Sequence, residues 1–180
     1  VAHFHMVMGI APVLVILGSI YHWFPLITGR LLDERLGKIH FWVTFIGSYS
    51  IYFPMHYLGF MGVTRRYFEV FEGEAFTYSI TGINQFITIA ALITGAAQFV
   101  FFYNIIVSSK LGKKAGKNPW KACSLEWQTP DVPPTHGNFG KELPVVYRWA
   151  YDFSVPGADK DYITQDTPPS AVPDAKVEQT

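Results

Sequence analysis

This 180-residue sequence contains few charged residues and a single cysteine. Asp, Glu, Lys and Arg make up 16% of it, against about 25% in typical soluble domains. The 14 basic and 14 acidic residues cancel, so the chain lacks the basic surplus of nucleic-acid-binding proteins. The lone Cys123 excludes an intrachain disulfide framework and a metal site with several cysteine ligands. The chain begins with Val1 and shows no signal-peptide pattern, so we interpret it as a piece of a longer polypeptide.

Charge is missing altogether from three long segments, namely residues 1–28, 39–64 and 75–109. Each exceeds the ~20 apolar residues that cross a ~30 Å hydrocarbon core. The backbone in lipid must satisfy its own hydrogen bonds, so each segment is expected to be a helix, kinked in the first two at Pro12 and Pro54. Buried helices of a large soluble protein are the alternative, and three such segments in so short a chain disfavour it. We predict an all-α membrane protein with transmembrane helices at about residues 1–27, 39–62 and 77–108.

The remainder, residues 110–180, has a different composition. It contains 9 of the 12 prolines and 18 of the 28 charged residues. Prolines break long helices, so an extended tail pinned by aromatic side chains is expected. The loop after the first span and the start of this tail together contain eight basic residues, against two in the loop after the second span. The positive-inside rule therefore places the tail in the cytoplasm.

His3 and His5 are the strongest candidates for chemistry, because ionisable residues inside membrane helices are usually functional. Two positions along an α-helix correspond to a rotation of ~200°, so the two imidazoles project from opposite faces. Each could then ligate a separate centre, such as a haem iron, with Phe4 at the edge between the two. The alternative is a pair of histidines hydrogen-bonded to neighbouring helices or facing lipid headgroups.

Arg65 and Arg66 follow the second span, on the same outer side as the two histidines. Arginine forks bind carboxylates through charge-assisted hydrogen bonds, so this pair could hold haem propionates. A solvated pair facing lipid phosphates is the alternative. The other histidines are weaker candidates: for His40 and His56, a satisfied position inside the bundle is favoured over a hydrated cavity.

Several runs of the sequence closely resemble the carboxy-terminal part of subunit I of the haem–copper oxidases. The resemblance covers about 150 residues and rests on VAHFHMVMG (Val1–Gly9), HWFPLITG (His22–Gly29), KIHFWVTFIG (Lys38–Gly47), FPMHYLGFMGVTRRY (Phe53–Tyr67) and LEWQTPDVPPTHGNF (Leu125–Phe139). It implies that the three spans are the last three of a twelve-helix subunit. One departure is Met6, which stands where the family often has a tyrosine.

The resemblance also implies roles for individual residues. His3 is similar to the axial ligand of the high-spin haem at the oxygen-reducing site, and His5 to one of the two axial ligands of the low-spin haem. Phe4 would lie between the haems, and Arg65 and Arg66 would hold propionates. Two haems, expected to be a-type, are implied as cofactors. Copper is expected in the complex, ligated by residues outside this chain.

The implied function is that of a terminal respiratory oxidase, a cytochrome c oxidase of the bacterial cytoplasmic membrane. It would reduce dioxygen to water with electrons from cytochrome c and translocate protons. This chain would act only together with the remainder of subunit I and with subunits II and III. The alternatives are a quinol-oxidising or nitric-oxide-reducing member of the superfamily and a non-catalytic accessory subunit with three spans.

Overall fold

The computed structural model describes residues 1–64, 74–134, 136–140, 142–151 and 163–171, and for residues 74–79 the backbone alone. Every element in these ranges is a helix, apart from one isolated β-bridge. Contacts divide the chain into two compact units. Unit 1 comprises Val1–His22 and Leu32–Gly112, and unit 2 comprises Trp23–Leu31 and Lys113–Thr180.

The first predicted span is one continuous helical segment, made of α1 (Ala2–Phe4), the π-helix η1 (His5–Ile10) and α2 (Ala11–Thr28). Pro12 has no backbone N–H to donate to the carbonyl of Met8, and its ring crowds that carbonyl. The wider π turns lie directly before this proline, where the α pattern is interrupted. The effect of Pro12 is thus a change of helix type over His5–Ile10.

The second predicted span is divided between α3 (Glu34–Tyr52) and α4 (Pro54–Phe60). Asp33 caps α3 by accepting a hydrogen bond from the amide of Leu36 at 2.9 Å. The regular pattern stops at Phe53, because Pro54 cannot donate to the preceding turn. The third span corresponds to α5 (Glu74–Leu111).

Two helices of the described chain are long and apolar enough to cross a membrane, Ala2–Thr28 and Ile80–Leu111. They correspond to the first and third predicted spans. The middle span is not among them, so the three-span topology and its orientation stay predictions.

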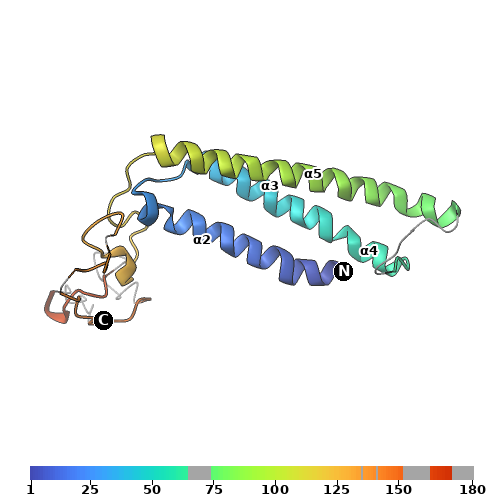
Figure 1. Ribbon diagram of the computed structural model, residues 1–180. Coiled ribbons are helices and arrows are strands. Elements are labelled where there is room, and N and C mark those ends of the chain that lie inside the picture. The colour runs from blue at the N-terminus through green and yellow to red at the C-terminus, as the bar shows by residue number, and fades with distance from the viewer. Residues whose placement is uncertain (65–73, 135, 141, 152–162, 172–180) are drawn as a thin grey trace, which may run out of the picture. The chain divides into compact units, whose positions relative to one another are not determined.

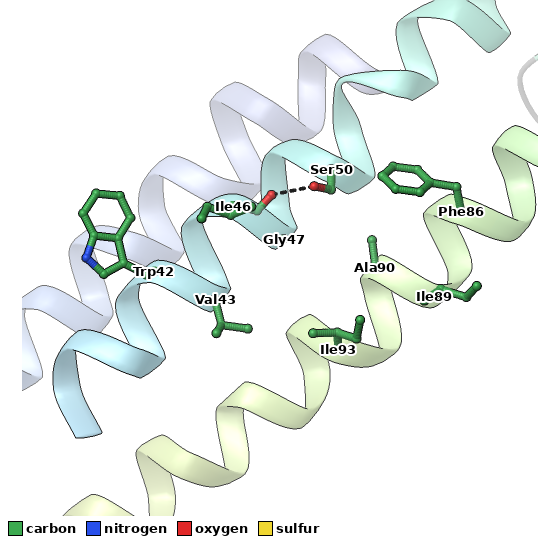
Figure 2. A pocket seen from close by; sticks show the side chains of 9 residues that line it. All are labelled: Trp42, Val43, Ile46, Gly47, Ser50, Phe86, Ile89, Ala90 and Ile93. Carbon is green, nitrogen blue, oxygen red and sulfur yellow. Dashed lines mark hydrogen bonds between the residues drawn. The ribbon is translucent and has the colours of Figure 1, made fainter. Parts of the chain in front are cut away.

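Unit 1 is held together chiefly by α3 and α5, which run side by side (Figure 1). The two helices approach closely at Gly47, where an added Cβ atom would overlap Oγ1 of Thr94. Small residues allow such an approach between membrane helices, where van der Waals packing and hydrogen bonds drive association. Beside this contact the same helices form an apolar groove of about 360 Å³ (Figure 2), lined mainly by Trp42, Val43, Ile46, Phe86, Ile89 and Ile93.

A column of polar side chains occupies the buried interface between α3 and α5. His40 is 2% exposed, and its Nε2 lies 3.2 Å from Oε1 of Gln98. Gln98 in turn donates to the hydroxyl of Thr44 at 3.0 Å. Nearer the start of α3, Asn104 is fully buried and bonds both the amide and the carbonyl of Asp33, each at 3.0 Å. These bonds fix the register of the two helices, because buried polar groups are costly without partners.

Unit 2 contains the last turns of α2 and the described parts of the predicted tail. Gly29 leaves α2 with a φ of +69°, a conformation that glycine adopts at no steric cost. The following residue, Arg30, forms an antiparallel bridge with Lys114. In the tail, Trp127 is 1% exposed and belongs to the short 3₁₀ helix η2 (Leu125–Trp127).

Gln165 connects three segments of the tail in unit 2. Its backbone amide donates to the carbonyl of Cys123 at 3.0 Å, and its carbonyl accepts from the amide of Tyr147 at 2.9 Å. Its side-chain Oε1 accepts from the amide of Leu125 at 3.0 Å, and Nε2 donates to the carbonyl of Arg148 at 3.2 Å. The proline-rich tail forms no regular strand or long helix in the part of the chain that the structure describes. Hydrogen bonds from the backbone and side chain of Gln165 connect its segments instead.

Candidate functional site

His3, Phe4 and His5 lie where the short helix α1 meets the π-helix η1. π-Helical turns occur frequently at functional sites, because they change the direction of side chains within an otherwise regular helix. The spacing of the two histidines predicts an α-helical rotation of ~200° between them. The structure keeps the helix unbroken but widens it from His5 onward.

The surroundings of His5 restrict its ring on two sides. Nδ1 lies 2.9 Å from the backbone carbonyl oxygen of Val1, so a protonated Nδ1 donates this bond and Nε2 keeps the lone pair. The ring also stacks on Tyr52 from α3, with centroids 5.3 Å apart and planes at 11°. Metal-ligating histidines commonly donate their other ring N–H to a backbone carbonyl, which fixes tautomer and orientation. The half-buried His5 therefore has the environment of a pre-oriented imidazole ligand.

His3 has different surroundings. Its side chain is exposed, and the described residues give it no hydrogen bond or ring contact. The His5 ring is stacked on Tyr52 of α3 and the His3 ring is exposed, so the two imidazoles have different surroundings. Phe4 is also exposed, at 62%, and meets the His5 ring edge-on at 5.4 Å.

The donor atoms that this helix offers are the imidazole nitrogens of His3 and His5. The donor set is chemically suited to haem iron, which imidazole commonly ligates. Among the residues that the structure describes, no group of three or more His, Cys, Asp and Glu side chains gathers to hold a metal ion. The candidate site is therefore the pair of imidazoles that this one helix carries.

The two predicted propionate-binding residues, Arg65 and Arg66, lie outside the described residues. His40 and His56, the weaker candidates, have ordinary partners. His40 bonds through both ring nitrogens, to Gln98 and to the hydroxyl of Tyr21 at 3.2 Å, as expected for a satisfied histidine inside the bundle. His56 donates from Nδ1 to the carbonyls of Tyr52 and Phe53, both at 3.2 Å.

Sequence reasoning missed Tyr52 as a neighbour of the site. Tyr52 is 47 residues from His5, and no motif connects the two. The pattern contained one indirect signal: Pro54 ends α3 shortly after Tyr52. Consecutive spans run in opposite directions, so the C-terminal end of α3 is expected beside the N-terminal end of the first helix.

Comparisons with known proteins identify the family to which the chain is similar. Residues 1–108 match the sequence profile of the family described as cytochrome c and quinol oxidase polypeptide I. The chain is 60% identical over 169 residues to the alternative cytochrome c oxidase subunit 1 of Bradyrhizobium diazoefficiens, covering 94% of this chain and 29% of that protein. It is 40% identical over 155 residues to cytochrome c oxidase subunit 1 of Synechocystis, and 43% identical over 158 residues to that of Thermostichus vulcanus. Each of these two alignments covers 86% of this chain and 27% of the relative. The chain therefore spans less than a third of the relatives it matches.

Proposed function

This chain belongs to the cytochrome c and quinol oxidase polypeptide I family, and from that premise we propose that it is part of the catalytic subunit of a terminal respiratory oxidase. In this function, dioxygen is reduced to water with electrons from cytochrome c, coupled to proton translocation. The observation that carries the proposal is the helix that presents two imidazoles toward different surroundings, with His5 already oriented by Val1 and Tyr52.

In this function His5 would hold the iron of a low-spin haem and His3 the iron of a high-spin haem. The hydrogen bond from Nδ1 of His5 to Val1 holds the ring in one tautomer and directs Nε2 outward. Tyr52 limits rotation of the same ring by stacking on it. Bound haem iron would supply the one-electron redox chemistry, with a potential that the axial ligands tune.

Phe4, between the two histidines in sequence, would occupy the space between the haems. The ring of Phe4 is exposed. A porphyrin lying against this ring would remove its apolar surface from water, which is favourable. Arg65 and Arg66 would bind the propionates. Two haems of a-type are proposed, with copper ligated by residues of the complex outside this chain.

The proposed partners are the remainder of subunit I, subunits II and III, and cytochrome c. The proposed location is the bacterial cytoplasmic membrane, with the tail from residue 110 on the cytoplasmic side. The family description also covers quinol oxidases, but the relatives named above are cytochrome c oxidases, which favours cytochrome c. Steady-state oxidation of reduced cytochrome c compared with a quinol, by the purified complex, distinguishes the two donors.

Histidine replacement tests the ligand assignment in the assembled complex. We expect His5→Ala to remove the low-spin haem band from the optical spectrum. We expect His3→Ala to abolish oxygen consumption while low-spin haem is retained. His56→Ala is the matched control, because His56 bonds to carbonyls of its own turn, and its spectrum should match that of the unmodified complex. An unchanged low-spin band in His5→Ala would refute the assignment.

A further inference from the structure

The imidazole ring of His5 packs against Tyr52, the last residue of α3. Both residues belong to unit 1. The two ring planes are 11° apart and their centroids are separated by 5.3 Å, an offset-stacked arrangement of the kind that aromatic pairs prefer. Phe4 approaches the same imidazole at 88°, with centroids 5.4 Å apart. Tyr52 therefore supplies the ring that lies parallel to the imidazole.

The hydrogen bond of His5 restrains the plane of its ring only loosely. Nδ1 lies 2.9 Å from the carbonyl oxygen of Val1, and this bond selects the tautomer. The torsion that turns a histidine ring about its Cβ–Cγ bond has broad minima, however, and one hydrogen bond restrains a single atom. At the Cδ2 edge, a Cβ added at Gly9 would lie 3.8 Å from the ring, so the glycine leaves that edge uncrowded. The plane of the imidazole thus depends on Tyr52.

Stacking of this kind is strong enough to select one orientation of the ring. The gain of an aromatic pair beyond the burial of its area corresponds to roughly a two- to tenfold preference for the stacked orientation. Tyr52 is itself held in place, because its side chain is half-buried and η1 packs against α3. A flat side chain at the end of α3 therefore orients an imidazole in η1.

We propose that Tyr52 is a positioning residue that sets the plane of the His5 imidazole when His5 holds the iron of the low-spin haem. This role rests on the proposed function, in which His5 is a haem ligand. Groups that orient a ligating histidine tune the metal it holds, and axial ligation is one means by which a protein controls haem iron. The overlap of imidazole π orbitals with iron d orbitals depends on the ring plane. Tyr52 would therefore influence the g values and the midpoint potential of this haem through His5.

The test combines electron paramagnetic resonance of the oxidised, purified complex that contains this chain with a redox titration of its low-spin haem. We expect Tyr52→Leu to shift the largest g value of the low-spin signal by more than its linewidth, and to shift the midpoint potential. Tyr52→Phe keeps the flat ring, so both quantities should match those of the unmodified complex. Tyr52→Met fills the space with a flexible side chain; it should behave as Tyr52→Leu does, and it carries the test if Tyr52→Leu fails to assemble.

Tyr49→Leu is the matched control, because Tyr49 lies on the same helix and its ring packs on Phe45. Its g values and midpoint potential should equal those of the unmodified complex. An unchanged low-spin signal in Tyr52→Leu or Tyr52→Met would overturn the proposal, and so would an equal shift in Tyr49→Leu or in Tyr52→Phe.

His5→Ala separates this failure from failure of the proposed function. If His5→Ala loses the low-spin signal while Tyr52→Leu leaves it unchanged, the ligand assignment stands and only the role of Tyr52 is wrong. If His5→Ala retains the signal, His5 is not the ligand and both proposals are wrong.

Discussion

The contact between Gly47 and Thr94 makes a sharp prediction for Gly47→Ala. The new Cβ would overlap Oγ1 of Thr94 and lie 3.1 Å from its Cβ, and ordinary contact begins only at 3.4 Å. Thr94 cannot easily give way, because its hydroxyl bonds the carbonyl of Ala90 at 2.7 Å.

Overpacking of this kind costs about 1–3 kcal/mol. At about 2–4 °C per kcal/mol, Gly47→Ala should lower the thermal midpoint of the detergent-solubilised complex by roughly 2–12 °C. Thr94→Ala removes the Oγ1 atom that clashes most. The double variant Gly47→Ala/Thr94→Ala should therefore be more stable than the sum of the two single changes predicts, with a coupling of about 1–2 kcal/mol.

The matched control is Gly95→Ala on the same helix, where an added Cβ would meet nothing within 4 Å. Alanine favours the helix by about 1 kcal/mol over glycine, so this variant should not lower the thermal midpoint. The reasoning is refuted if Gly47→Ala is as stable as the unmodified complex, or if Thr94→Ala brings no recovery in the double variant.

Three further predictions concern hydrogen bonds and charge. Asn104→Leu should destabilise unit 1 by about 1–3 kcal/mol, because the carbonyl of Asp33 loses its donor and the buried hydroxyl of Ser108 loses its acceptor; the thermal midpoint of the complex measures this, and an unchanged midpoint would contradict it. The hydrogen bond and the charge of Lys38 hold the pKa of Glu34 below its usual value, so the carboxylate persists to lower pH than in an unpaired glutamate. Lys38→Met should raise that pKa, as followed by carboxyl-carbon NMR, and an unshifted titration would argue against the 2.7 Å ion pair. Gln165→Ala should speed hydrogen exchange at the amide of Leu125, which would lose its acceptor; equal exchange in both proteins would show that the tail does not depend on this side chain.

Much of the helical organisation follows from the sequence alone. Membrane-spanning segments must be apolar and must bond their own backbone groups, so gaps in charge predict helices directly. The first and third predicted spans correspond to the long apolar helices Ala2–Thr28 and Ile80–Leu111. Pro54 correctly predicted an interruption of the second segment, because the missing N–H acts on the chain locally.

The two histidines of the candidate site could be predicted from the sequence, but the residues and the helix type around them could not. His3 and His5 stand out because imidazoles are rare in apolar segments, and helix geometry separates them. Neither the π-helix at His5 nor its stacking on Tyr52 could be predicted from spacing. The first is a local response to Pro12, and the second depends on which helix packs against η1.

Composition and spacing by themselves determined where the helices lie, which residues can ligate metal, and where basic residues collect. The tertiary structure alone decided the partners: Gln98 for His40, Thr94 against Gly47, and Lys114 opposite Arg30. The physical reason is the range of the forces involved. Hydropathy and backbone hydrogen bonding depend on residues that are close together in the chain. The helices they produce can therefore be predicted from the order of the residues. Side-chain contacts join residues 47 to 84 positions apart in these cases, and only the packing of helices and tail selects which of the many possible pairs forms.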